Sequence, residues 1–480
     1  MPWIRGGKRG RTMNRKLGLP SAIATGVGLI VATSCLMSLG QGTSILGTGF
    51  IITMIFACAI NILTALSMSE LNALMPNLTG GLAQYTLAGM GPFVTILTMV
   101  GGYLVCQAIA GSVECAMFGN SINSVFDTGI PSSVLSIAMV VILMIANLHG
   151  VDLFAKVQNV VAYVLIGSLM IMGIIGALGL GSGAMADQPM NLASSASDTF
   201  SLLGMAFFLF IGCEFVIPIA KNIKNERRNV PLGMILSLLL ILLMQIFLVT
   251  GMSRYTNYEE LGASASPHIL YGTAILGKAG SYWMILVSTL AVVSTVNSAM
   301  SSFSFMCAGM AKINLLPEIF LKKNKKGAYY VGILVIGFIE IIVNATGMST
   351  SNSLIFMINV AIVFWMVSYI VSNINVVIFR IKLPKAPRTF KVPFGPVLPV
   401  VSAVGTLFMI WNIDPDPSTR NLIFVIDLII FAILGVYSVV WCKLKVKRPL
   451  FQAIPMHEVM AMENEMYLAV HKDREKEKEM

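Results

Sequence analysis

The sequence contains twelve apolar runs, each near the length of about 20 residues that a helix needs to cross a lipid bilayer. They lie near residues 19–40, 46–69, 92–120, 132–148, 157–180, 199–220, 231–252, 281–310, 329–347, 353–379, 395–412 and 421–442. Of the 480 residues, 56% are hydrophobic and only 11% are charged, and the mean hydropathy is +0.83. A soluble fold cannot bury that much apolar surface. The sequence therefore predicts an all-α polytopic membrane protein with twelve transmembrane helices.

Basic residues are distributed unevenly between the predicted loops. If both tails are cytoplasmic, 29 of the 32 Lys and Arg residues fall on that side, and only Arg254, Lys278 and Arg420 fall outside. Because cytoplasmic loops of membrane proteins are enriched in Lys and Arg, this pattern predicts a protein of the cytoplasmic membrane with both termini inside. The net charge of +10 then reflects orientation and contact with the lipid bilayer. We expect no nucleic-acid partner.

The cysteines and histidines show no pattern typical of a metal site. The seven cysteines lie in or beside apolar runs without a CxxC pair, so we expect them to be packing residues. The histidines are expected in loops or tails, without metal-ligand spacing: His149, His268, His457 and His471. No HExxH or GxSxG motif is present. We therefore predict no enzyme, no cofactor and no metal.

The stretch 206–231 places a carboxylate inside an apolar run. Glu214 follows Gly212, and Pro218 lies four residues after Glu214. A carboxylate at the centre of a bilayer costs about 2.5–3.5 kcal/mol, and a proline leaves the carbonyl at position i−4 without its donor. Broken helices are tolerated at membrane depth only where they line a cavity or are buried in protein. A kink with a paired glutamate is the structural alternative, but the pattern favours a transport site, with the sixth span interrupted at 211–215.

The first span shows a second candidate break. It holds six small or hydroxyl residues that permit either close packing or unwinding: Gly26, Gly28, Thr33, Ser34, Gly40 and Gly42. Thr33-Ser34-Cys35 and Gly212-Cys213-Glu214 lie equally far from the starts of spans 1 and 6. This spacing favours a break at 32–35. It also predicts two repeats of five spans, which are inverted because five is odd.

The predicted organisation has five parts. A basic cytoplasmic tail (1–18) precedes the first five-helix repeat (19–180), and the second, inverted repeat follows (199–379). Two further helices (395–442) lead to a charged cytoplasmic tail (443–480). We also expect a short interfacial helix around Leu82–Leu87 and a short helix that frays within the C-terminal tail.

Other polar residues lie in the predicted spans. Glu114 shares one helical face with Gln107 and Gly111, so it should face the bundle interior, either as a substrate ligand or as a structural pair. Span 8 carries a polar stripe, for which interhelical hydrogen bonds are the favoured explanation: Ser294, Asn297, Ser298 and Ser301. Glu340 and Asp427 are expected to be structural.

Three stretches resemble the amino acid–polyamine–organocation superfamily. They are FIGCE followed by KNIKNERRNVP (210–231), SELNALMPNLTGGLAQY (69–85) and AGMAKINLLPEIF (308–320). The resemblance implies the inverted five-plus-five helix fold of the leucine transporter. It also implies that the two broken segments bind the substrate, here Ala32, Thr33, Ser34 and Cys35 together with Gly212, Cys213 and Glu214. Phe208 matches an aromatic residue that closes over the substrate, and either that role or simple packing would fit it.

The sequence departs from the superfamily pattern at two places. Glu226 replaces the proline of the loop motif, and the Gly-Ser-Gly of the first break corresponds to Thr33-Ser34-Cys35 or to Ala32-Thr33-Ser34. In the superfamily, the exposed amides at this break hold the carboxylate of the substrate. Without glycine, the backbone is stiffer and a ligand cannot approach it so closely. This departure puts an ordinary α-amino acid in question as the substrate.

The sequence thus predicts a secondary active transporter for an amino acid or a related amine that keeps its ammonium group. By resemblance, Glu214 couples transport to protons, and Glu114 is the second coupling candidate. The fixed lysine of some members is absent from span 5, where only Lys156 is basic, and this leaves Ser168 as a weak sodium-site candidate. Proton coupling, sodium coupling and plain exchange stay open. A sensor that binds without transporting also stays open.

Overall fold

The computed structural model describes residues 17–76, 78, 81–126, 128–149, 152–190, 195–217, 220, 223–347 and 351–462. The predictions for Pro218, Lys221 and most of both tails (1–16 and 463–480) fall outside the described residues, as does the side chain of Lys156. The described chain is helical, without strands, and has one isolated bridge between Leu17 and Ile223.

The first half of the chain forms ten α-helices and two further helical segments. They are α1 (Leu19–Ile30), α2 (Thr33–Leu46), η1 (Gly47–Gly49), α3 (Phe50–Leu74), α4 (Leu82–Met90), α5 (Pro92–Thr95), the π-helical η2 (Ile96–Val105), α6 (Cys106–Val125), α7 (Ser132–Leu148), α8 (Asp152–Ala177), α9 (Ala196–Ser201) and α10 (Leu203–Phe208). The segments α5, η2 and α6 follow one another without interruption.

The second half begins with η3 (Cys213–Val216). It continues with α11 (Glu226–Tyr255), α12 (Tyr258–Ala263), α13 (Pro267–Lys312), η5 (Glu318–Leu321), α14 (Tyr330–Ala345), α15 (Ser351–Lys382), α16 (Val397–Trp411), α17 (Pro417–Trp441), η6 (Cys442–Val446) and α18 (Met456–Ala461). Within α13, Gly277 has a φ of 60°, which divides this element into a short helix and a long one.

Length and hydropathy identify the membrane-crossing candidates among these elements. Seven described helical segments are long and apolar enough to cross a membrane, and five shorter apolar helices accompany them. The predicted apolar runs fall on these segments. Large apolar side chains cover the outside, for example Ile142 on α7, Val160 on α8 and Leu428 on α17. The molecule is therefore a multi-pass membrane protein whose outer surface suits lipid.

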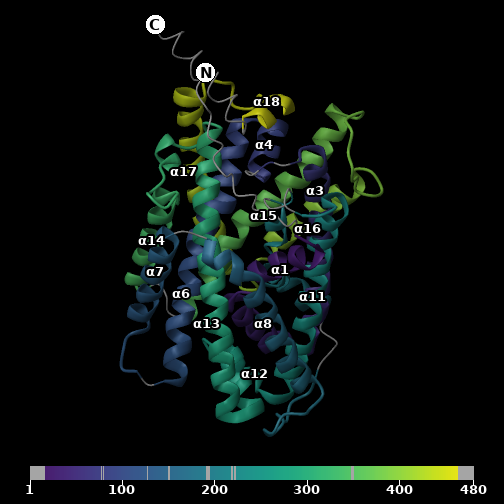
Figure 1. The fold of residues 1–480 in the computed structure, drawn as a ribbon. Helices are drawn as coiled ribbons and strands as arrows, with labels where there is room; N and C mark the ends of the chain where they lie inside the picture. Colours follow the sequence, from purple (N-terminus) through teal and green to yellow (C-terminus); the bar gives the residue numbers. More distant parts are fainter. Residues whose placement is uncertain are drawn as a thin grey trace, which may run out of the picture.

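The elements are arranged along one long axis (Figure 1). The helices α4 and α18 lie at one end, and α12 lies at the other end. The predicted helix around Leu82–Leu87 is present as α4, and Leu82–Gly89 are all buried within the protein. It packs against α15 and α18. His268, which was expected in a loop, is instead fully buried in the first turn of α13.

The first helix break lies slightly earlier than predicted. Val31 and Ala32 are non-helical, with ψ angles of 85° and 159°. Thr33, Ser34 and Cys35, which were expected to be unwound, form the first turn of α2. The small residues of this segment also serve packing, because a Cβ atom at Gly26 would come within 2.5 Å of the Ser237 hydroxyl on α11.

The second break lies at residues 209–212, between α10 and η3, and thus two to three residues earlier than the predicted 211–215. Cys213 and Glu214, which were expected to be unwound, lie in η3. Gly212 adopts a φ of 119°, a conformation that a residue with a Cβ atom avoids. The carbonyl of Leu209 accepts a hydrogen bond from Gln245 of α11 at 3.2 Å. A side chain thus satisfies backbone that the break has freed, as an apolar environment requires.

Candidate functional site

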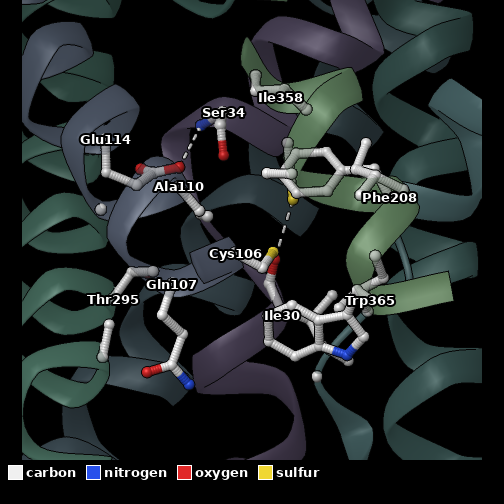
Figure 2. A pocket seen from close by; sticks show the side chains of 18 of the residues that line it. Ile30, Ser34, Cys106, Gln107, Ala110, Glu114, Phe208, Thr295, Ile358 and Trp365 are labelled. Atoms are coloured by element: carbon white, nitrogen blue, oxygen red, sulfur yellow. Dashed lines mark hydrogen bonds between the residues drawn. The ribbon is translucent and has the colours of Figure 1, made fainter. Parts of the chain in front are cut away.

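A cavity of about 80 Å³ lies between the two helix breaks. Its walls come from the α1–α2 break, from the α10–η3 break and from α6, α13 and α15 (Figure 2). Within the described residues, its lining contains one carboxylate and no Lys, Arg or His. Most of the lining is apolar, so the few polar groups in it decide what the cavity can recognise.

The structure gathers most of the predicted site residues around this cavity. Six of them line it: Ala32, Ser34, Cys35, Glu114, Phe208 and Gly212. Gln107 and Gly111 line it together with Glu114, as their helical spacing predicts. The other three predicted residues, Thr33, Cys213 and Glu214, are buried close by but are not among the lining residues.

The carboxylate of Glu114 binds the backbone at the start of α2. The amide of Ser34 donates to Oε1 at 2.9 Å, and the amide of Thr33 donates to Oε2 at 3.0 Å. The first amides of a helix have no acceptor within the helix, and the helix dipole favours an anion at this end. Glu114 therefore occupies the place where a free anion would bind (Figure 2).

Two polar side chains in the cavity have no partner. Both amide atoms of Gln107, whose exposed fraction is 3%, lack a hydrogen bond to any described residue. The hydroxyl of Thr295 on α13 lacks one as well in the described part of the chain. Both side chains lie on the same side of the cavity in Figure 2. Because unsatisfied buried polar groups are costly, a pair beside a cavity suggests that a ligand or water completes them.

Glu214 turns away from the cavity toward α15. Its Oε1 accepts from Nε1 of Trp365 at 2.8 Å, and its Oε2 accepts from the Tyr369 hydroxyl at 2.6 Å. The same hydroxyl also lies 3.4 Å from the amide nitrogen of Gly212, which donates to it. Glu214 is thus linked to the cavity indirectly, because Trp365 and Gly212 both line it.

Aromatic rings build one wall of the cavity. Trp365 lies 6.0 Å from Phe215 and 5.4 Å from Tyr103 between ring centroids. Such edge-to-face and tilted contacts hold rings in defined positions. Because the indole nitrogen of Trp365 is bound to Glu214, a change at Glu214 would reach the cavity through this ring.

Two further carboxylates, Glu340 and Asp427, are buried but do not line the cavity. Glu340 is fully buried, and neither of its oxygens has a hydrogen-bond partner among the described residues. It lies behind Gly111, where a Cβ atom would come within 2.1 Å of Oε1. Asp427 on α17 also lacks partners within the described chain. In the polar stripe of α13, Asn297 accepts from Asn147 at 2.8 Å, an interhelical hydrogen bond of the expected kind.

Two further cavities lie toward the ends of the molecule. One, of about 300 Å³, is lined by residues such as Gln41, Ser264 and Asp414 near α12. Burial raises the pKa of Asp414 above its usual value, although Asn359 donates a hydrogen bond to it at 3.2 Å. The other, of about 100 Å³, lies near Pro76 and Arg227 at the opposite end. Ile355 lines the cavity near α12, and Ile358, about one turn later on α15, lines the central cavity.

The sequence did not predict the hydrogen-bond partners of Glu214 or the unpartnered hydroxyl that lines the cavity. Trp365 and Tyr369 lie in an apolar run some 150 positions later in the chain, without a local signal. Thr295 lies beside the polar stripe that the sequence does show, but its own environment depends on the packing of α13 against α6.

Comparison with known proteins identifies the family. A family model described as amino acid permease matches residues 17–436. The branched-chain amino acid permease BcaP of Bacillus subtilis (strain 168) is 22% identical over 449 residues, covering 88% of this chain and 93% of that protein. The methylthioribose transporter of the same organism is 23% identical over 438 residues, covering 85% of this chain and 88% of that protein.

A solved structure supports the fold. The crystal structure of the Eremococcus coleocola manganese transporter, in complex with an aromatic bis-isothiourea substituted compound, matches with a TM-score of 0.57 and 14% sequence identity. The match covers 92% of this chain and 97% of that one. The family model extends over most of the chain, in agreement with the superfamily resemblance of its motifs. The chain therefore belongs to the amino acid permease family and is a membrane transporter rather than an enzyme.

Proposed function

We propose that this protein is a secondary active transporter that moves an amino acid or a related amine across the cytoplasmic membrane by alternating access. The central cavity carries the proposal, because it lies where two helical segments are interrupted on the inside of a membrane protein. Interrupted helices provide free backbone groups for binding substrates and coupling ions. Among the described residues, the cavity lining has one carboxylate and no basic side chain, which favours a ligand with an ammonium group over a dianion.

The topology proposed for this transporter has twelve crossings with both termini in the cytoplasm. Residues 19–180 and 199–379 form two inverted five-helix repeats, and residues 395–442 add two helices. The positions of the breaks support this arrangement, because Val31–Ala32 and Leu209–Gly212 lie at corresponding places in the two repeats. The cavities near α12 and near Pro76 lie on opposite sides of the central one, as a site opened alternately to two sides requires.

The residues of the two breaks have separate roles in this proposal. Ala32, Ser34, Cys35, Phe208 and Gly212 contact the substrate. Thr33 and Cys213, which are buried next to the breaks but do not line the cavity, stabilise the backbone of the breaks.

Glu214 and Glu114 are the groups that we propose to couple transport to protons. Both are buried beside a break: Glu114 binds the amides that follow the first break, and Glu214, just after the second break, binds Trp365 and Tyr369 of α15. Exchange of one substrate for another uses the same site without net proton movement.

The relatives support a small organic substrate. One relative is a branched-chain amino acid permease and another is a methylthioribose transporter. These two relatives are named for different substrates, although each is about equally similar to this chain over most of its length. The choice of substrate therefore depends on the few polar groups of the cavity rather than on the fold.

Transport and binding should be measured on the same purified protein. We expect proteoliposomes to accumulate or exchange a labelled amino acid or amine from a mixed panel, with stimulation by an inward proton gradient if protons are coupled. Replacing the proton gradient by a sodium gradient tests sodium coupling. Binding without any flux would identify a sensor and contradict the proposal.

A further inference from the structure

We propose that the central cavity selects an amine that has an apolar body and no carboxylate. The inference rests on the proposed transport function and narrows its substrate. It starts from Glu114, which fills the position at which the start of α2 would otherwise hold an anion.

The anion position at α2 is fully occupied. α2 is 14 residues long, and its amides at Thr33 and Ser34 are the donors nearest the break. Each of them donates to a different oxygen of Glu114, at 3.0 and 2.9 Å. A ligand carboxylate would have to displace Glu114 from both amides or lie beside it. Either arrangement leaves one of two like charges without its donors in a buried site.

The other donors of the cavity do not offset this cost. The indole N–H of Trp365 is already bound to Glu214. Gln107 offers an uncharged amide, and Thr295 and Ser302 offer hydroxyls. The lining contains no Lys, Arg or His among the described residues, so no fixed positive charge faces a ligand anion.

The groups left without partners suit an ammonium group. A carboxylate has about four acceptor sites, so Glu114 can accept a further hydrogen bond besides those from the amides of Thr33 and Ser34. The Oε1 of Gln107 and the hydroxyl of Thr295 are acceptors without a partner in the described structure. An ammonium group has three N–H donors. The carboxylate of Glu114 is the acceptor that suits the charge of an ammonium group, and the amide oxygen and the hydroxyl are further acceptors along the same cavity.

The rest of the cavity suits an apolar body. The remaining lining includes five large apolar side chains: Ile30, Phe208, Phe215, Ile358 and Trp365. The face of Trp365 can also attract a cation at about 6 Å from the ring centroid. A small amine with a branched or aromatic carbon skeleton would therefore satisfy the polar groups and fill the apolar wall.

Pairs of ligands that differ only in the carboxylate test this inference. 3-Methylbutylamine and leucine share one side chain, and 2-phenylethylamine and phenylalanine share another. We expect each amine to bind the purified protein roughly tenfold to a hundredfold more tightly than its amino acid, measured by isothermal titration calorimetry. In proteoliposomes, the amines should also compete better for uptake.

Substitution of Glu114 should reverse this preference. Glu114→Ala frees the amides of Thr33 and Ser34, so the amines should bind roughly tenfold more weakly and the amino acids should gain affinity. Glu114→Gln keeps an acceptor for one amide and removes the charge, so it should lose amine affinity without the same gain for amino acids. If Glu114→Ala aggregates during size-exclusion chromatography, Glu114→Gln supplies the comparison.

The outcomes separate this inference from the proposed function. If the parent protein transports leucine or phenylalanine and binds it more tightly than the matching amine, the inference is wrong while transport stands. If Glu114→Ala leaves both ligand preferences unchanged, Glu114 does not select the substrate and the inference is also wrong. If a panel of amino acids and amines gives neither binding nor flux, both proposals fail.

Discussion

Single carboxylates organise the interior of this protein, and each does so through backbone or aromatic donors. Glu114 joins α6 to the start of α2, and Glu214 joins the second break to α15. Neither forms an ion pair with a basic side chain among the ion pairs of the described residues. A charge held by uncharged donors can be lost by protonation without leaving an opposite charge unpaired. This property suits a group that must change its charge during transport.

The first prediction concerns Glu214. Glu214→Gln preserves the size of the side chain, and the Tyr369 hydroxyl can rotate to accept from the new amide. We expect a folded protein that binds substrate but no longer accumulates it in response to a proton gradient. Glu259→Gln, an exposed position on α12, is the control. Uptake by Glu214→Gln equal to that of the parent protein at every pH would remove Glu214 from the coupling mechanism.

The second prediction concerns the unpartnered amide of Gln107. Gln107→Leu keeps the approximate size and removes two polar groups without partners in the described structure. We expect the free energy of unfolding of the ligand-free protein to rise by about 1–3 kcal/mol, and ligand affinity to fall. Thermal unfolding in detergent, with and without ligand, measures both effects. Unchanged affinity would show that Gln107 does not contact the ligand.

The helix breaks show how far sequence reasoning reached at the level of elements. Gly212 marks the second break and has the positive φ that explains it, but the break covers residues 209–212 rather than the predicted 211–215, and Glu214 lies in η3. The first break lies earlier than predicted, because Thr33–Cys35 can begin a helix once Glu114 binds the amides of Thr33 and Ser34. That contact joins residues about 80 positions apart, so no local pattern could predict it.

The third prediction concerns the packing of α6 against α14. An ideal Cβ atom at Gly111 would lie 2.1 Å from Oε1 of Glu340 and 3.0 Å from its Cδ. We expect Gly111→Ala to lower the free energy of unfolding by about 1–3 kcal/mol and to distort the cavity wall. Gly435→Ala on α17 is the matched control, because no atom lies within 4 Å of its added Cβ. Equal melting temperatures for the two variants would contradict this packing.

At the scale of the whole molecule, composition and periodicity were sufficient to predict an all-helical, multi-pass membrane protein. The apolar runs predict helices that the structure contains, and the outer apolar surface follows from them. The interior was harder to predict, because burial alone does not show which polar groups meet. Trp365 and Tyr369 look like ordinary apolar packing in the sequence, yet they hold Glu214. The orientation in the membrane is still a prediction from the basic residues.

The fourth prediction tests that orientation. Asp187 is exposed between α8 and α9, and Lys322 is exposed between α13 and α14. Each is replaced by cysteine in a separate variant. In intact cells, a membrane-impermeant maleimide should label Asp187→Cys and should label Lys322→Cys only after the cells are opened. The seven native cysteines are buried, so their background labelling should be low. The reverse pattern would invert the proposed topology.

The central claim is that substrate passes through the cavity between the two helix breaks. Ala110 lines this cavity, and Ala146 is exposed on the outer face of α7. Ala110→Phe and Ala146→Phe add the same volume, the first inside the cavity and the second on the surface. Uptake of a labelled transported ligand into proteoliposomes, with folding checked by size-exclusion chromatography, tests the claim most directly. We predict that Ala110→Phe abolishes uptake and that Ala146→Phe retains it, whereas undiminished uptake by folded Ala110→Phe would contradict the claim.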